Sequence, residues 1–89
     1  MLDVRLDAWL REYGARTHES LEADSVGQLL DALETRYPRL KFKIRDETGQ
    51  IRPYVRVFVD GEDVSAAGGA AVSLVGVRSV AILHSIAGG

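Results

Sequence analysis

Residues 54–61 read Tyr-Val-Arg-Val-Phe-Val-Asp-Gly and carry the strongest structural signal in the chain. The first six are mostly β-branched or aromatic, a composition typical of a strand, and Asp60-Gly61 is a preferred two-residue hairpin turn. Side chains alternate across a strand, so its two faces should differ. We expect one face to carry Val55, Val57 and Val59 and the other Tyr54, Arg56 and Phe58. The sequence therefore predicts a central strand that turns back through residues 62–64.

A helix is predicted upstream of this strand. Ser25 and Gln28 fit a capping box, in which the serine side chain caps the first amides and the glutamine reaches back to the N–H of Ser25. Apolar residues then recur at helical spacing, at Val26, Leu29, Leu30, Leu33 and Tyr37. Pro38 ends the run because proline cannot continue a helix. We expect one amphipathic helix.

Two strands are expected before the helix. Residues 2–8 alternate apolar and charged side chains, which predicts a half-buried strand with inward positions Leu2, Val4, Leu6 and Ala8. Residues 9–14 interrupt the alternation. Residues 16–21 then resume a β-tolerant composition, so we expect a second strand that returns as a hairpin.

The last strand is expected at residues 79–86, where apolar residues dominate again. Its inward positions are Val80, Ile82 and Ile86, whereas Ala81 and Leu83 face outward. Three connecting segments are less regular. Residues 39–45 fit either a strand or a short turn of helix, because strict alternation there follows a proline. Residues 46–50 indicate a turn, and residues 65–71 indicate a loop of small side chains.

This order of elements predicts an α+β domain, with a mixed sheet of about five strands packed on one main helix. Because a helix crossover follows the second strand, the first and last strands are expected to pair in parallel at the centre of the sheet. A chain of 89 residues has room for one core, so we expect a single domain over residues 1–89.

Amino-acid composition excludes several classes of function. Hydrophobic residues make up 46% of the chain and charged residues 27%, as in soluble globular domains. A formal charge of −2 gives no broad field for nucleic acid or anionic membrane, and without cysteine there are no disulfides, thiolate metal sites or cysteine nucleophiles. No apolar run approaches the roughly 20 residues of a membrane span, and residues 1–5 do not resemble a signal peptide. We expect a cytoplasmic protein without membrane or nucleic-acid partners.

Catalysis by this chain is not expected. Only His18 and His84 can titrate near neutral pH, and neither has a serine or cysteine in a recognisable arrangement. Two histidines 66 positions apart also form no metal-ligand motif. We therefore expect no catalytic residue, no metal site and no cofactor, with His18 on the hairpin and His84 on an exposed strand face.

One region is polarised in charge. Residues 36–56 contain seven basic side chains and two acidic ones, Asp46 and Glu47. Tyr37, Phe42 and Tyr54 lie among them, a pattern that single-stranded nucleic-acid surfaces also show. A solvated face, or a surface for an acidic partner, is the alternative that we favour, because the overall charge is negative.

The chain closes with Ala87-Gly88-Gly89 directly after the predicted last strand. Two glycines have no side chains, so such an end fits a narrow channel and leaves the terminal carboxylate open to attack. Frayed ends also contain glycine, and it is the position immediately after an anchoring strand that favours a functional tail. We expect a flexible tail that enters the active site of another protein.

Three segments together resemble the ubiquitin-like β-grasp sulfur carriers, the group that contains MoaD, ThiS and CysO, with the CysO type most similar. They are residues 25–34 with Tyr37-Pro38 for the helix, 54–64 for the central hairpin and 80–89 for the last strand and tail. The resemblance covers nearly the whole chain and implies a β-grasp fold. It departs at residues 75–78, which read Val-Gly-Val-Arg where the family usually has an acidic turn, and at His84-Ser85, where a proline is common.

Members of this family are protein substrates and not catalysts. The resemblance implies that an ATP-dependent activating enzyme of the MoeB/ThiF type adenylates the carboxylate of Gly89, that sulfur displaces AMP, and that Gly88 and Ala87 thread the tail. The thiocarboxylate would then donate sulfur to an accepting enzyme, such as a cysteine synthase or a synthase of molybdopterin, thiazole or a thiosugar. ATP, Mg²⁺ and pyridoxal phosphate belong to those partners.

Strand parity also predicts a docking surface. Phe58 and Leu83 lie on strand faces opposite the helix, so they are expected to form an apolar patch beside the tail, with Arg56 at its rim. A second small core under the loop is the alternative position for them. Two other functions stay open: a ubiquitin-like modifier that forms isopeptide bonds through the same tail, and a non-covalent binding module that does not use the glycines.

Overall fold

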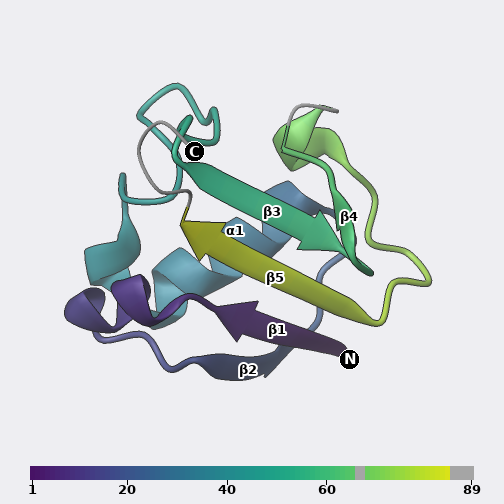
Figure 1. The fold of residues 1–89 in the computed structure, drawn as a ribbon, viewed down its shortest axis with the longest axis horizontal. Coiled ribbons are helices and arrows are strands. Elements are labelled where there is room, and N and C mark those ends of the chain that lie inside the picture. Colours follow the sequence, from purple (N-terminus) through teal and green to yellow (C-terminus); the bar gives the residue numbers. More distant parts are fainter. Residues whose placement is uncertain (66–67, 85–89) are drawn as a thin grey trace.

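A mixed sheet lies across one main helix in the computed structural model, which describes residues 1–65 and 68–84 (Figure 1). The strand order is β2-β1-β5-β3-β4. The strands are β1 (Leu2–Leu6), β2 (His18–Leu21), β3 (Val55–Val59), β4 (Glu62–Asp63) and β5 (Ser79–His84). The helices are α1 (Val26–Arg36) and three short 3₁₀ helices, η1 (Ala8–Tyr13), η2 (Pro38–Leu40) and η3 (Gly69–Ala71). The predicted α+β class and five-stranded sheet are confirmed.

The middle of the sheet is the last described strand. β5 pairs in parallel with β1, with Val4 opposite Val80, and antiparallel with β3, with Val57 opposite Ile82. The predicted parallel pairing of the first and last strands is therefore confirmed. β1 flanks β5 only as far as Ile82, whereas β3 pairs with it up to His84, opposite Val55.

The core fills the space between the sheet and α1. Helix residues Leu29, Leu30 and Leu33 are fully buried against strand residues that include Val57 and Ile82, and Figure 1 shows α1 crossing behind the sheet. Each fully buried aliphatic side chain contributes on the order of 1.5–3 kcal/mol relative to exposure. The alternating pattern of β1 and the helical spacing of α1 thus define one shared apolar interior.

The chain leaves β1 earlier than the sequence predicts. The strand ends at Leu6, and Ala8, expected inward, is exposed at the start of η1. The cause is Asp7, whose carboxylate caps η1 by accepting a hydrogen bond from the N–H of Trp9 at 3.2 Å. Turning here into a 3₁₀ helix takes Ala8 off the sheet.

Of the two hydrogen bonds predicted for the cap of α1, one forms as expected and the other has a different partner. The N–H of Gln28 donates to the Ser25 hydroxyl at 3.1 Å, but the Gln28 side chain accepts from Asp24 at 2.9 Å and not from Ser25. The entry to α1 is fixed on both sides by segment 72–74, since Leu74 donates to the carbonyl of Asp24 and Val26 donates to that of Val72. This pairing turns the Asp24 amide toward the first turn of the helix.

Residues 39–45, which the sequence left between strand and helical turn, form the helical turn η2 and then an irregular segment. Leu40 and Ile44 are fully buried and anchor it, while Phe42 has a φ of 67° and is exposed. The turn predicted at residues 46–50 is confirmed. The Asp46 carboxylate accepts hydrogen bonds from the Thr48 hydroxyl, the Thr48 N–H and the Gln50 N–H, and these bonds lower the pKa of Asp46.

The β3–β4 hairpin turns at the two residues expected. Asp60 has a φ of 47° and Gly61 a φ of 88°, the two positive values that a type I′ turn requires. The Asp60 carboxylate also accepts hydrogen bonds from the N–H groups of Arg78 (3.1 Å) and Ser79 (2.9 Å). The turn therefore positions the start of β5 as well as reversing the chain. In the part of the chain described, no helix is long and apolar enough to cross a membrane.

Candidate functional site

The predicted tail lies beyond the last described strand. Ala87, Gly88 and Gly89 are outside the described residues, as is Ile86, which the sequence placed inward. The site is therefore built from the residues around the end of β5. Two surfaces meet there: the outer face of the sheet, opposite α1, and a group of rings at the strand end.

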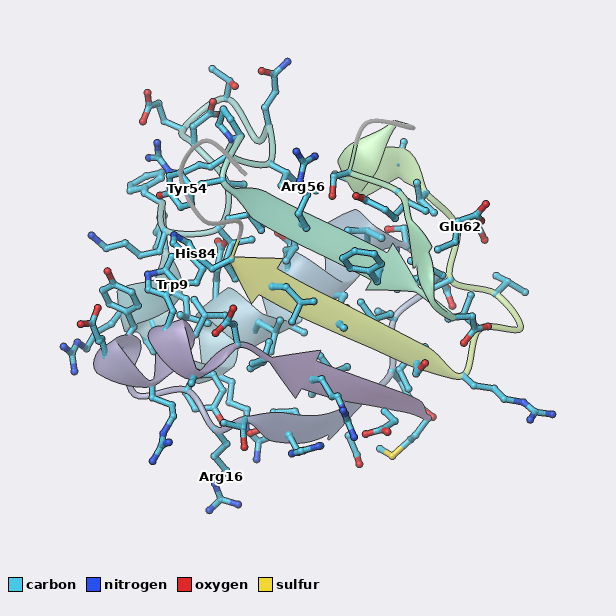
Figure 2. All side chains as sticks on the ribbon, viewed as in Figure 1. Trp9, Arg16, Tyr54, Arg56, Glu62 and His84 are labelled. Carbon is cyan, nitrogen blue, oxygen red and sulfur yellow. The ribbon has the colours of Figure 1, made fainter. Side chains whose placement is uncertain are left out.

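The outer face brings the predicted docking residues together. Arg56 on β3 lies opposite Leu83 on β5, and Phe58 lies opposite Ala81 two residues further along the same pair of strands. Leu83 is 39% exposed, and Arg56 and Phe58 are half-buried. We name Arg56, Phe58 and Leu83 the outer patch. Their strand neighbours Val57 and Ile82 are buried, so alternation puts the patch on the side of the sheet away from the core, and Figure 2 shows Arg56 on β3.

Arg5 extends this face and was missed from sequence. The parallel pairing sets Arg5 opposite Ala81, so the small alanine lies between the longer side chains of Arg5 and Phe58. The result is a hollow of about 380 Å³ lined by Asp3, Arg5, Phe58, Gly61, Ser79, Val80 and Ala81. Alternation along β1 shows that Arg5 faces outward, but its neighbour depends on a register that alternation does not specify.

The end of β5 is fastened to the beginning of η1. The Asp7 carboxylate accepts a hydrogen bond from the N–H of His84 at 2.8 Å, and the N–H of Asp7 donates to the carbonyl of Ile82 at 2.9 Å. The other carboxylate oxygen of Asp7 caps η1 through Trp9. One side chain thus fixes both the last described residue of the strand and the helix that carries the neighbouring rings.

Four rings gather around this point, and we call Trp9, Tyr13, Tyr54 and His84 the ring cluster. The centroid of Trp9 lies 4.8 Å from that of His84, 5.8 Å from Tyr54 and 6.3 Å from Tyr13, and Tyr54 lies 5.5 Å from His84. Figure 2 shows Trp9, Tyr54 and His84 side by side at the end of β5. The edge-to-face contacts of Trp9 with Tyr13 and Tyr54 each contribute about 0.5–1.5 kcal/mol beyond area burial.

The sequence placed His84 on an exposed strand face, and His84 is exposed, but its ring contacts were not foreseen. The contacts join residues 9, 13, 54 and 84, which come from distant parts of the sequence, so no local pattern predicts them.

Much of the basic segment is engaged within the fold. Arg45 pairs with Glu34 at 2.9 Å and with Asp31, and the hydrogen bond to Glu34 is the main cause that raises the pKa of Arg45. Arg36 pairs with the buried Glu19 at 3.4 Å. Two more guanidinium groups donate to carbonyls, Arg39 to that of Glu12 and Arg52 to that of Phe42. Four of the seven basic side chains therefore make ion pairs or hydrogen bonds within the fold.

The two lysines and the aromatics of this segment take separate positions. Lys41 lies over the ring of Phe42 at 5.4 Å, and Lys43 lies over the ring of Tyr13 at 5.2 Å. Tyr37 donates a hydrogen bond to Glu19 beside the core, whereas Tyr54 belongs to the ring cluster. The three aromatics therefore form no continuous stacking surface with the basic side chains.

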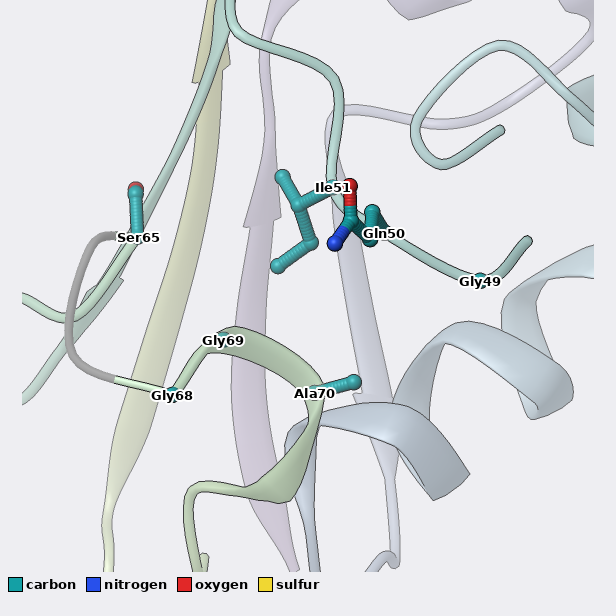
Figure 3. A pocket seen from close by; sticks show the side chains of 7 residues that line it. All are labelled: Gly49, Gln50, Ile51, Ser65, Gly68, Gly69 and Ala70. Carbon is teal, nitrogen blue, oxygen red and sulfur yellow. The ribbon is translucent and has the colours of Figure 1, made fainter. Parts of the chain in front are cut away.

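Other candidate features carry less chemistry. Among residues 1–65 and 68–84, no group of His, Cys, Asp and Glu side chains is arranged to hold a metal ion. His18 is exposed on the edge strand β2. A hollow of about 430 Å³ is lined by Gly49, Gln50, Ile51, Ser65, Gly68, Gly69 and Ala70, and Figure 3 shows these residues from close by. These seven residues have no ionisable side chain, and the Ser65 hydroxyl already accepts from Val57 at 2.7 Å.

Fold and site together define a ubiquitin-like β-grasp protein with β5 as its central strand. Comparison with known proteins agrees. The family model described as the ThiS family matches residues 4–89, and the chain belongs to this family. The sulfur carrier protein CysO of Mycobacterium tuberculosis, and that of Mycobacterium bovis, is 31% identical over 78 residues, which cover 85% of this chain and 84% of the relative.

Solved structures show the same fold. The crystal structure of Mycobacterium tuberculosis CysO superposes with a TM-score of 0.84 at 27% identity, covering 97% of this chain and all of the other. A chain of the Amycolatopsis orientalis BexX/CysO complex also gives 0.84, at 25% identity and full coverage of both. The small archaeal modifier protein 1 of Methanosarcina acetivorans gives 0.75 at 25% identity, covering 99% of this chain and 95% of the other. The β-grasp fold and the resemblance to CysO-type carriers are confirmed.

Proposed function

We propose that this chain carries sulfur as a thiocarboxylate on Gly89. The observation that carries the proposal is the central strand β5, which ends at His84 and continues into Ala87-Gly88-Gly89 within a chain of the ThiS family. Asp7 holds the end of β5, so the tail starts from a fixed point. The body would provide recognition, and the tail would provide the reacting group.

The chemistry is two substitutions, both catalysed by partners. An oxygen of the Gly89 carboxylate attacks the α-phosphorus of ATP, and pyrophosphate leaves with the electrons of the broken P–O bond. A sulfur nucleophile then attacks the Gly89 carbonyl carbon, and AMP leaves. Without Cβ atoms, Gly88 and Gly89 leave that carbon uncrowded. An activating enzyme of the MoeB/ThiF type would perform these steps, and a cysteine synthase-like or other synthase would accept the sulfur.

Reach limits how a partner can bind. The five residues after His84 extend to at most about 17 Å. An enzyme that reacts with Gly89 must therefore bring its active site within that distance of the strand end, so it must contact the adjoining surface. The outer patch fits this role, because Leu83 and Phe58 offer apolar area, Arg56 a cation, and Ala81 a hollow between larger side chains.

Mass spectrometry of the protein from its native host tests the proposal. We expect a fraction of the chains to carry sulfur in place of one oxygen, and fragmentation to place that sulfur on Gly89. Fragmentation is required because oxidation of Met1 adds a nearly equal mass. A chain recovered only as the free acid during active sulfur metabolism, or a Gly89→Ala variant that is charged and discharged at the natural rate, would contradict it.

The outer patch has its own test. Leu83→Asp should weaken binding to the activating enzyme by about tenfold or more, since truncation or charge at a central apolar contact costs on the order of 2 kcal/mol. Val75→Asp is the matched control, because Val75 is 77% exposed in the loop before β5 and lies outside the patch. Equal effects of the two variants would remove the patch from the proposal.

A second candidate function has one observation in its favour. The small archaeal modifier protein 1 matches 99% of this chain with a TM-score of 0.75, so the same tail could serve as a protein modifier. Adducts of the chain that survive thiol reductants in host extract, and that map to lysines of other proteins, would support this function. Adducts that disappear on reduction would count against it.

A further inference from the structure

One edge of the sheet is a strand with free backbone groups. β2 lies at one end of the strand order, and Figure 1 shows it along the lower border of the sheet. The strand at the other edge, β4, has only two residues. An unpaired edge strand is a template for pairing with a further strand. β2 is therefore the longer of the two edges at which the described sheet can be extended.

The free groups of this edge belong to His18 and Ser20. The N–H of Leu6 donates to the carbonyl of Thr17 at 2.8 Å, which makes these two residues a hydrogen-bonded pair between β1 and β2. Hydrogen-bonded and non-hydrogen-bonded pairs alternate along an antiparallel ladder, so in the observed register Glu19 also bonds to β1. The N–H and C=O groups of His18 and Ser20 then point away from the sheet, and both residues are exposed.

The two ends of β2 carry opposite charges. At its start, a hollow of about 530 Å³ has no acidic side chain in its lining, which consists of Arg11, Ala15, Arg16, Thr17 and His18. At its end come the exposed residues Glu22 and Asp24. Within the described part of the chain, none of Arg11, Arg16 and Glu22 takes part in an ion pair. Two copies of β2 placed antiparallel would bring the acidic end of each onto the basic end of the other.

We propose that β2 pairs with β2 of a second copy of this chain, antiparallel and about a two-fold axis at Glu19. In this register His18 of each copy lies opposite Ser20 of the other, so the free N–H and C=O groups of both residues become hydrogen-bonded. Two residues further out, Arg16 lies opposite Glu22 of the second copy, and the symmetry repeats this ion pair. The product is a closed dimer whose continuous sheet takes five strands from each copy.

The like charges at the two-fold axis are compensated within each copy. The Glu19 side chain is 5% exposed and is directed to the α1 side of the sheet, where Arg36 pairs with it at 3.4 Å. Tyr37 donates a hydrogen bond to the same carboxylate. Each copy therefore supplies its own cation and hydrogen-bond donor to Glu19, and the pairing of the two strands leaves no unpartnered carboxylate at the axis.

Sedimentation equilibrium and amide exchange test the pairing. So short an edge makes a small and weak interface, and we expect a reversible monomer–dimer equilibrium as the protein concentration rises to about 1 mM. The amides of His18 and Ser20 should exchange more slowly in the dimer, because they become hydrogen-bonded. A chain that stays monomeric over this range, or a dimer without protection of these two amides, would overturn the proposal.

Charge reversal tests the register. Arg16→Glu, and likewise Glu22→Arg, places like charges opposite each other twice in the dimer and should weaken association by about tenfold or more. The double variant, Arg16→Glu with Glu22→Arg, only exchanges the two charges and should restore the natural association. Arg78→Glu is the matched control, because it changes the net charge as Arg16→Glu does but precedes β5, which β1 separates from β2.

The control should associate as the natural protein does. Weak association of the double variant, or an equal loss in Arg78→Glu, would overturn the proposal. None of these results bears on sulfur transfer, which this inference does not use.

Discussion

The Asp7 carboxylate and the His84 N–H lie 77 residues apart in sequence and are joined by a 2.8 Å hydrogen bond. Through its other oxygen, Asp7 also caps the helix that carries Trp9, whose ring packs on His84. A single acidic side chain therefore orders the end of the central strand and the rings around it. The relationship fixes the position of His84, the last described residue of the central strand.

Variants of Asp7 should reveal the contribution of its hydrogen bonds to Trp9 and His84. Asp7→Ala removes both acceptors and should destabilise the protein by about 0.5–2 kcal/mol, as loss of a helix cap does. Asp7→Asn keeps one acceptor oxygen and should fall between Asp7→Ala and the natural protein. Urea unfolding gives the free energies, and amide exchange at His84 and Trp9 reports the two bonds. Unchanged exchange at both amides in Asp7→Ala would contradict this description.

Removal of the Tyr37 hydroxyl should clearly lower the free energy of unfolding. It donates to Glu19, whose side chain is 5% exposed and has Arg36 as its ion-pair partner. Tyr37→Phe leaves a buried carboxylate oxygen without that donor, and we expect a loss of about 1–3 kcal/mol in the free energy of unfolding.

Tyr54→Phe is the matched control for this change. The Tyr54 hydroxyl donates at 3.3 Å to the Lys43 carbonyl at the surface, where water can replace it. Its removal should cost clearly less than Tyr37→Phe in the same urea titration. Equal costs would mean that Glu19 does not depend on the tyrosine.

The hairpin turn should be sensitive to the residue at position 61. Gly61→Ala forces a Cβ into a left-handed conformation with φ of 88°, although no other atom lies within 4 Å of that position. We expect a loss of about 1–2 kcal/mol from backbone strain alone. Gly61→Asn should lose less, since asparagine tolerates this region. Equal thermal unfolding of the two variants would show that strain at this φ is not the cause.

Acid should weaken the loop after β4. The N–H and the hydroxyl of Ser65 hydrogen-bond the Asp63 carboxylate and lower its pKa below 3.8. A carboxylate with a depressed folded-state pKa stabilises the protein above the unfolded pKa, and this contribution disappears as pH falls through the folded value. The difference in unfolding free energy between the natural protein and Asp63→Ala should thus be constant above about pH 5 and shrink below pH 3.8. A difference that grew in acid would contradict the assignment.

The candidate site could be anticipated only in part. Parity along β3 and β5 placed Arg56, Phe58 and Leu83 on the face away from the helix, because alternation is a local property of extended chain. The contribution of Arg5 and the ring cluster could not be found this way. Arg5 depends on the β1–β5 register, and the rings come from segments that meet only when the sheet has formed.

Local patterns alone determined the elements of this protein: the period-two strands, the helix between Ser25 and Pro38, the Asp60-Gly61 turn and the parallel pairing implied by their order. Each follows from short-range backbone preference and the burial of one apolar face. Tertiary structure decided where β1 ends, which amide the Gln28 side chain caps, and that residues 7, 9, 54 and 84 meet at the strand end. Those outcomes depend on hydrogen bonds and packing between distant segments, whose free energy exists only once the core has brought them together.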